Sequence, residues 1–376
     1  MAPRRRDGGD LPVSIETGQA YEFLMSAVTF TETDHYSVAE IGAEWLADAE
    51  RAAGADLVRR LHDFAQGTGD GLIHLLALAY DAPGRDVASF IGHLRELAAD
   101  EIVLHAIAHY EYHYRRMTPP ETMRAAVDGD RAAIREFLHS VRDWPEWQAF
   151  LERNLGRDVE DIKAEVIGLL TEWNERVWLP QQERIMAILE RDADAKRELS
   201  RRLPFEEFVE VATNGVRFVP HPGIERVVLV PDYINRPWVS NIEHRGAMIL
   251  IYPVADESVA ADLDTPPLRL VRLAKALGDE KRLRILRALA ENPRGLADLA
   301  EQFEMPKTTM HHHMVTLRSA GLVSVGAGTK DYRIRRDALP DLVQLLSGYI
   351  GTDTDGEGRA SASASRRPPR RRRPGG

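Results

Sequence analysis

The stretch MPKTTMHHHMVTLRSAGLV, residues 305–323, carries three consecutive histidines in a chain that contains no cysteine. Its apolar residues Met310, Met314 and Leu317 recur at intervals of three and four, which predicts a helix with one apolar face. Because successive residues of a helix are about 100° apart, the histidines at 311–313 fan around the axis and cannot bind one ion together. The stretch therefore predicts a helix that packs through its methionines and has no metal site on its histidines.

A helical pattern precedes this stretch and a strand pattern follows it. LADLAEQF, residues 296–303, places its apolar side chains on one helix face, and only the short segment 304–306 separates the two helices. GLVSVGAGTKDYRIRR, residues 321–336, has the pattern of two strands joined at a glycine-rich tip. Two helices joined by a tight turn and followed by a β-hairpin predict a winged helix-turn-helix.

This region resembles the winged helix-turn-helix of the ArsR/SmtB family of bacterial transcription regulators. LAKALGDEKRLRILRALAE (273–291) is similar to the entry of the family's motif, and TTMHHHMVTLRSAGLV (308–323) is similar to its recognition helix. The resemblance extends over about 85 of the 376 residues and departs from the family at Pro306, where many members have a serine. It implies double-stranded DNA as the partner and repression of transcription. It also implies a homodimer formed through the first and last helices of residues 266–350, whose apolar positions are Leu270, Leu273, Ala274 and Leu277, and Leu342, Leu345, Leu346 and Ile350.

The resemblance also bears on cofactors. Metal-sensing members of the family commonly use cysteines on the first helix of the motif, or Asp and His on the last helix. The corresponding segments here, RGLADL (294–299) and DALPDLVQLLSGYI (337–350), contain neither Cys nor His. We therefore expect no metal or other cofactor in this region.

The side chains opposite the methionines of the predicted recognition helix should enter the major groove, and the flanking cations should contact phosphates. For any one of these positions the alternative is an ordinary solvated polar residue. The predicted DNA-contacting residues are Lys307, Thr308, Thr309, His311, His312, Val315, Arg318, Lys330, Arg333 and Arg335.

The distribution of charge agrees with this assignment. Residues 266–350 carry 14 Lys and Arg against 9 Asp and Glu, and residues 351–376 carry 7 against 3. Residues 1–265 carry 28 against 47, which makes this larger part strongly acidic. A basic C-terminal part on an acidic chain favours a polyanionic partner for the C-terminal part alone.

We predict a mainly α fold, in which a multi-helix N-terminal body with a small β-rich segment precedes the winged helix-turn-helix. The prolines at 266 and 267 mark the boundary. The β-rich segment rests on four short runs: FVEVAT, GVRFVP, RVVLVP and AMILIYPV. The predicted parts are a disordered arm (1–12), a mostly helical regulatory or oligomerisation body (13–262) with β structure near 205–255, the DNA-binding domain (266–350) and a disordered Arg/Pro-rich tail (351–376).

One other cluster, in DEIVLHAIAHYEYHYRR (100–116), has a pattern that bears on metal binding. Glu101, His105 and His109 recur every four residues, so on a continuous helix two neighbours could share one ion with outside ligands. Histidines on a partly solvated helix face are the simpler interpretation. No glycine-rich phosphate loop, GxSxG or HExxH is present, and we expect no enzyme activity.

We place the chain in the cytoplasm, with no membrane partner. Its basic start is not followed by an apolar segment, and the longest apolar run, GAMILIYPV (246–254), is too short to span a bilayer. The function we predict is a sequence-specific, dimeric repressor whose body senses a small molecule or a partner. Two alternatives stay open: a metal-responsive or enzymatic body with an appended DNA-binding module, and a winged helix that binds protein.

Overall fold

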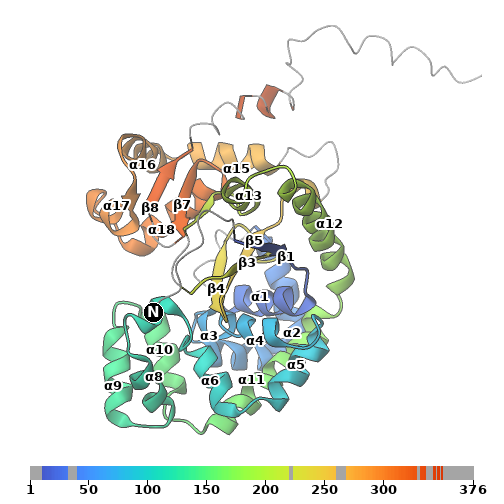
Figure 1. The fold of residues 1–376 in the computed structure, drawn as a ribbon, viewed down its shortest axis with the longest axis vertical. Helices are drawn as coiled ribbons and strands as arrows, with labels where there is room; N and C mark the ends of the chain where they lie inside the picture. Colours follow the sequence, from blue (N-terminus) through green and yellow to red (C-terminus); the bar gives the residue numbers. More distant parts are fainter. Residues whose placement is uncertain are drawn as a thin grey trace, which may run out of the picture.

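The computed structural model describes residues 11–32, 40–219, 223–259, 268–327, 331–335, 342–343, 345–347 and 349. Within these ranges the chain is mainly helical with two small sheets, as predicted (Figure 1). The helices of the body are α1 (Gln19–Thr31), α2 (Gly42–Ala65), α3 (Asp70–Ile73), α4 (Leu76–Asp81), α5 (Val87–Glu96), α6 (Ala99–Ala106), α7 (Tyr112–Arg115), α8 (Pro120–Val127), α9 (Arg131–Ser140), α10 (Pro145–Asn154), α11 (Val159–Trp173) with its π-helical extension (Asn174–Trp178), α12 (Gln182–Ser200), α13 (Phe205–Ala212) and α14 (Asp256–Val259).

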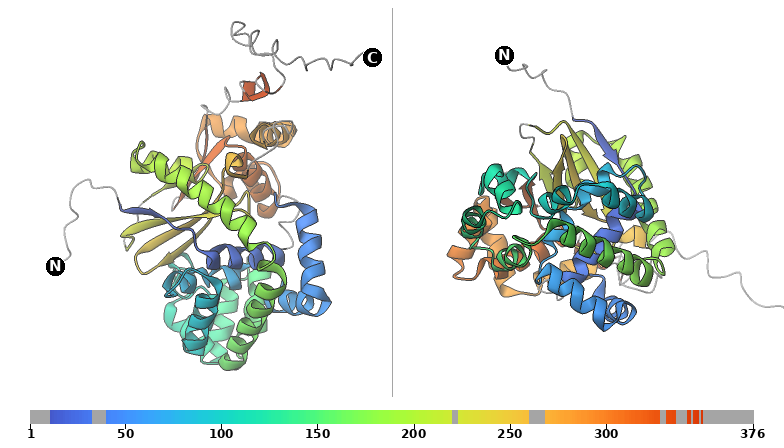
Figure 2. Two further views of the ribbon diagram at one scale, coloured as in Figure 1. Left: turned by 90° about the vertical axis from the view of Figure 1, so that its right-hand side faces the viewer. Right: turned by 90° about the horizontal axis from the view of Figure 1, so that it is seen from below.

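The first sheet lies between the helical layer that contains α1 and the helices α12 and α13 (Figures 1 and 2). Its strands are β1 (Val13–Ile15), β3 (Arg226–Asp232), β5 (Ala247–Pro253) and β4 (Ser240–His244), in that spatial order. β1, β3 and β5 are parallel, and β4 is antiparallel to β5. Alternate residues of β3 enter different cores: Val228 and Val230 pack with the helical layer, whereas Val227 and Leu229 pack with α13. Both faces of this sheet are therefore buried.

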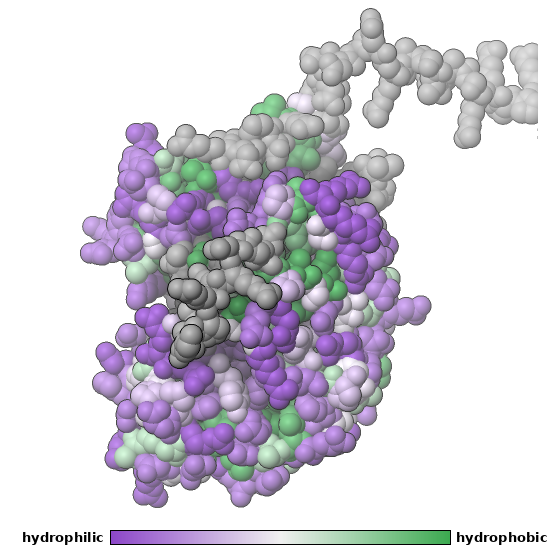
Figure 3. Space-filling model, viewed as in Figure 1, coloured by the Kyte–Doolittle hydropathy of each residue, from purple (hydrophilic) through white to green (hydrophobic). Residues whose placement is uncertain are grey.

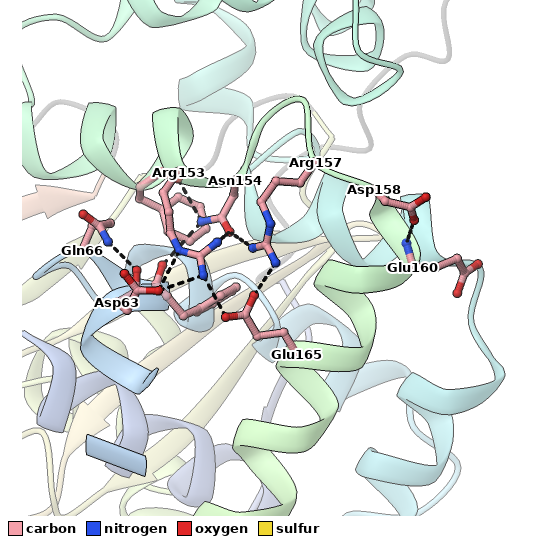
Figure 4. A network of polar contacts seen from close by, with 10 residues as sticks. Asp63, Gln66, Arg153, Asn154, Arg157, Asp158, Glu160 and Glu165 are labelled. Carbon is pink, nitrogen blue, oxygen red and sulfur yellow. Dashed lines mark hydrogen bonds and ion pairs between the residues drawn. The ribbon is translucent and has the colours of Figure 1, made fainter. Parts of the chain in front are cut away.

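An ion-pair network fastens α10 to α2 and α11 (Figure 4). Arg153 at the end of α10 donates to Asp63 of α2 at 3.0 Å and to Glu165 of α11 at 2.9 Å. Arg157 adds a second contact to Glu165 at 2.8 Å. The network joins three helices of the body, so we assign it a structural role.

Two of our predictions, one for the body's β structure and one for the N-terminal arm, were wrong in detail. FVEVAT belongs to α13, because Phe205, Phe208, Val209 and Ala212 form one buried helical face behind Pro204. The arm that we predicted to be disordered included residue 12, but the Pro12 carbonyl accepts from Val227 N at 2.9 Å and is followed by β1. Residues 1–10 and 351–376 lie outside the described residues.

The C-terminal region has its own core. Its described elements are α15 (Leu268–Leu277), α16 (Glu280–Glu291), β6 (Arg294–Gly295), α17 (Leu296–Gln302), α18 (Lys307–Ser319), β7 (Val323–Ala327) and β8 (Asp331–Ile334). Leu273, Ile285, Leu299 and Met310 are among the side chains that pack together between these helices. The α17–turn–α18 arrangement confirms the predicted helix-turn-helix.

One strand from the body completes the sheet of this region. β2 (Val216–Phe218), predicted as part of the body's β segment, pairs in parallel with β7, and the sheet order is β2-β7-β8-β6. Its Phe218 side chain belongs to the core around α13 and packs edge-on against Phe205, with ring centroids 5.8 Å apart. β2 therefore links the two cores, which residue spacing in one short segment could not reveal.

The described part of the chain has no helix that is both long and apolar enough to cross a membrane. The molecular face drawn in Figure 3 is largely hydrophilic, and its apolar side chains are gathered in small separate patches.

Candidate nucleic-acid interface

The helix α18 forms where the sequence predicted it. Pro306 stands at its N-cap with an extended ψ of 145°, and Met310, Met314 and Leu317 are all fully buried. Ala320 and Gly321 end the helix, and the positive φ of Gly321 turns the chain into β7. The missing serine at position 306 therefore leaves the helix intact.

The two helices before α18 are positioned by caps and a tight turn. Asp279 caps α16 by accepting from Arg282 N at 2.9 Å, and this backbone hydrogen bond is the first cause of the lowered pKa of its carboxyl. Asp298 reaches back to Gly295 N at the start of α17. Glu304 adopts a positive φ of 52° in the turn that separates α17 from α18.

The first turn of α18 is open to solvent. Lys307, Thr308 and Thr309 are all exposed, as expected for residues that approach DNA. Arg333 on β8 is also exposed, at 54% of its side chain, and pairs with Asp331 at 3.0 Å. These four residues form the accessible part of the predicted interface.

One side of the middle of α18 faces the body. Trp238, in the loop between β3 and β4, stacks on His311 with ring centroids 5.8 Å apart and planes inclined by 22°. The same indole meets His312 edge-on at 6.5 Å. Both histidines are consequently half-buried.

The predicted exposed stripe of α18 was wrong at Val315, which is buried. It is only 4% exposed, although we placed it beside His311 on the side opposite the methionines. The prediction assumed that solvent covers this side of the helix, whereas the body supplies a second packing surface there. Val315 is therefore a buried contact in this arrangement.

Arg318 is half-buried in a cavity of about 210 Å³ at this junction. Burial lowers the pKa of its guanidinium, whereas the neighbouring Tyr332 phenol acts to raise it. Burial also raises the pKa of Tyr332 itself. The body side of the cavity is lined by Glu32, Asp70, Ile73, Asn235, Trp238, Val239 and Ser240. Carboxylates thus lie at the cavity where a DNA phosphate was expected.

Arg335, another predicted phosphate contact, lies at the junction with the body. Arg335 lines a second cavity, of about 240 Å³, together with Arg272 and Asp256 from either side of the junction. Its backbone N–H donates to Leu322 O at 2.9 Å. Lys330 lies outside the described residues.

A cluster of two arginines and two carboxylates holds α15 against the body. Arg272 of α15 donates from Nε to Glu40 at 2.6 Å and lies 2.9 Å from Asp256. Arg236, only 3% exposed, contacts the same two carboxylates and lies 3.4 Å from Glu40. Burial raises the pKa of Asp256, although both arginines act to lower it. The charges balance within a mostly buried cluster.

The predicted histidine stripe of the body is not continuous. α6 ends at Ala106, and Ala108 has a positive φ of 60°, so His109 does not continue the helix face of Glu101 and His105. Glu101 instead accepts from Tyr110 Oη at 2.6 Å and pairs with Arg124. No group of three or more potential ligands for a metal was found in the part of the chain that the structure describes.

His105 lines a cavity of about 730 Å³ between α6, α7 and the β4–β5 turn. Its ring lies 5.5 Å from that of His244, and His244 Nε2 lies 2.8 Å from Asp81 Oδ2. Burial lowers the pKa of His105 to about 3, so its imidazole is neutral. Arg115, Arg116 and Tyr112 line the outer part of the cavity.

Sequence reasoning missed the body's contribution to the interface, above all Trp238. A tryptophan between Pro237 and Val239, in a segment bounded by polar residues, indicates a loop whose large aromatic side chain packs against another part of the protein. Its contact lies more than 70 residues further along the chain, so the sequence offers no indication of what the ring would meet.

Comparison with known proteins bears on this region alone. Residues 279–325, from the N-cap of α16 into β7, match the model of the bacterial regulatory protein, arsR family. No curated protein and no solved structure matches the chain. The C-terminal region thus carries an ArsR-type helix-turn-helix, which supports DNA-binding transcription regulation.

Proposed function

We propose that the chain is a sequence-specific DNA-binding regulator that reads the major groove with α18. The observation that carries this proposal is the ArsR-family match, which falls on α16, α17 and α18. The exposed first turn at 307–309 enters the groove first, and the β7–β8 pair serves as the wing that follows the backbone. Lys307 and Arg333 are the exposed cations that position the helix on phosphates.

The test is selection of DNA by the purified full chain. Sheared genomic DNA is incubated with the protein, bound fragments are sequenced, and the best fragment is titrated at several salt concentrations. We expect a shared motif and an affinity that falls steeply with salt, because each phosphate contact releases counterions. If Lys307→Glu and Thr308→Ala leave the affinity for that fragment unchanged, the helix serves protein contacts instead.

We further propose that the regulator represses transcription as a homodimer. Leu270 and Leu273 of α15 are buried within their own chain, so the described residues of the predicted last helix (342–343, 345–347 and 349) offer the better dimer surface. Its Val343 is 67% exposed, and Leu346 and Tyr349 are 44% and 43% exposed. A symmetric contact between two such faces fits a two-fold operator.

This dimer is tested by mass photometry of two matched variants. Leu346→Glu should shift the chain to monomers, because it buries a charge in the proposed contact. Leu179→Glu changes a leucine that is 52% exposed on the body and should leave the mass unchanged. Equal masses for both variants would remove the support for this surface.

The cavity at His105 and His244 is our candidate for the effector site. It combines a neutral buried imidazole, a His–Asp contact and the Arg115 and Arg116 cations at its rim, which suits a small molecule with an anionic group. The described residues that line it include no Ser, Thr or Cys nucleophile, so we propose binding and not catalysis there. A ligand screen read as release from the selected DNA, repeated on His105→Ala, tests this assignment.

A further inference from the structure

The body loop that carries Trp238 lies against the helix that we propose for DNA reading. We propose that residues 235–240 act as an intramolecular cover of α18, so that the C-terminal region must separate from this loop before α18 enters a DNA groove. The inference rests on the proposed function and adds how the body regulates it.

The contact covers one defined face of the helix. His311, Val315 and Arg318 are spaced i, i+4 and i+7, so they lie on the same side of α18. All three line the cavity at Trp238, and the indole stacks directly on His311. This is the middle of the stripe that would face base edges.

DNA and the loop cannot occupy this face together. A helix with its side chains is about 10–12 Å across and the major groove is about 12 Å wide, so no further layer of protein fits on the reading face. Glu32 and Asp70, which line the same cavity, would also repel phosphates. The arrangement described here is therefore closed to DNA along its central reading face.

The loop is fixed to the body, which makes the C-terminal region the part that moves. The backbone N–H groups of Tyr233 and Ile234 donate to the buried Glu22 carboxyl group, at 3.2 and 3.0 Å. Thr29 Oγ1 on α1 donates to Asn235 Oδ1 at 3.2 Å. These bonds anchor residues 233–235, at the start of the loop, to side chains of α1.

The junction itself is built to separate more readily than a core. Pockets of about 210 and 240 Å³, each lined by residues of both parts, lie along the junction, so the two parts are not in direct contact over its whole area. Polar and charged side chains make up much of its lining, as in interfaces between mobile domains. The β2–β7 ladder of three residue pairs is a backbone link between the two parts and can serve as the hinge.

The decisive variant is Trp238→Ala, with Trp144→Ala as its match. Trp144 is 45% exposed at the start of α10, so its loss changes the tryptophan count without touching α18. If the closed form dominates, Trp238→Ala should tighten binding of the selected DNA fragment by about tenfold or more, and Trp144→Ala should not. Chemical modification of His311, followed by mass spectrometry without DNA, should also become faster in Trp238→Ala alone.

The outcomes separate this inference from the proposed function. Unchanged DNA affinity and unchanged His311 modification in a folded Trp238→Ala chain would overturn the cover. Faster His311 modification, with no DNA fragment bound by either chain, would support the cover and remove the DNA-reading role.

A measurement on the unaltered chain covers the case in which Trp238→Ala does not fold. Hydrogen exchange is compared with and without saturating amounts of the selected DNA fragment. Residues 235–240 should exchange faster when the DNA is bound, because α18 has left them. Unchanged or slower exchange in this loop would refute the cover without any substitution.

Discussion

Arg272 Nη1 on α15 lies 2.9 Å from Asp256 Oδ1 on α14, and this ion pair joins the C-terminal helices to the body. Glu40 and Arg236 complete the cluster, and the side chains of all four are at most 18% exposed. Two positive and two negative charges therefore compensate one another at a site that is mostly shielded from water.

Removing one member of this cluster should destabilise the chain. Arg272→Met leaves an uncompensated carboxylate in a buried site, and we expect the free energy of unfolding to fall by about 3 kcal/mol. Adding Glu40→Gln to Arg272→Met restores neutrality and should recover more than half of that loss. Urea unfolding of the two variants measures both effects.

An exposed arginine provides the matched control for this comparison. Arg197 pairs with Asp194 on α12, but its side chain is 42% exposed and that of Asp194 is 77% exposed. Arg197→Met should therefore change stability by less than about 1 kcal/mol. If both substitutions lowered the free energy of unfolding equally, burial of the Arg272 cluster would not increase its contribution to stability.

Lys307 should contribute to DNA affinity through charge alone. It is exposed at the first turn of α18, where it is proposed to contact phosphate. In Lys307→Ala we expect weaker binding on every DNA sequence and a log affinity–log salt slope that is smaller by about 1. Titrations of the selected fragment and of an unrelated duplex at several salt concentrations test this.

The control for Lys307 is Arg59→Ala on α2, which removes a cation whose side chain is 70% exposed on the body. Its salt slope should equal that of the unaltered chain. A loss in Lys307→Ala confined to one DNA sequence would assign this residue to base reading instead.

The fold of the C-terminal region was predictable because its signals are local. Met310, Met314 and Leu317 revealed the buried face of α18 by spacing, and Asp279 and Gly321 lie at helix ends where their residue types favour caps and turns. Such patterns depend on neighbours within two or three turns, which a sequence displays directly.

The contacts between the two parts were not predictable, because they join segments far apart in the chain. Val216 pairs with Val325, and Trp238 packs on His311, yet each residue is compatible with several other partners. Val315 illustrates the consequence for the site: helical spacing gave its direction correctly, but only the fold shows that the body fills that direction.

Asp279 should stabilise the helix-turn-helix through its cap. Its side chain accepts from Arg282 N at the start of α16, so Asp279→Ala leaves a helix N–H without this acceptor and should cost about 1 kcal/mol. Asp279→Asn keeps a capping oxygen and should retain most of the stability. Thermal unfolding distinguishes the two, and an equal loss in both would point to the charge of Asp279 and not to its hydrogen bond.

Glu111 should make the stability of the body depend on pH. Its carboxyl is buried beside β4 and accepts from Glu243 N at 3.3 Å, and burial raises its pKa from 4.5 to about 8. Between these values the native chain keeps a proton that the unfolded chain releases, so unfolding becomes easier as the pH rises. The contribution of the protonated group is complete below pH 4.5 and is lost as the pH passes through about 8.

Glu111→Gln isolates this effect, because the amide cannot ionise and its oxygen still accepts from Glu243 N. From about pH 5 to about pH 8, the unaltered chain should lose stability relative to Glu111→Gln by an amount on the order of 3 kcal/mol. Glu121→Gln makes the same chemical change at an exposed position of α8 and should follow the unaltered chain at both pH values. Parallel stability profiles for the unaltered chain and Glu111→Gln would mean that Glu111 is solvated or ionised in the native state, because only a carboxyl held neutral by burial retains the proton up to about pH 8.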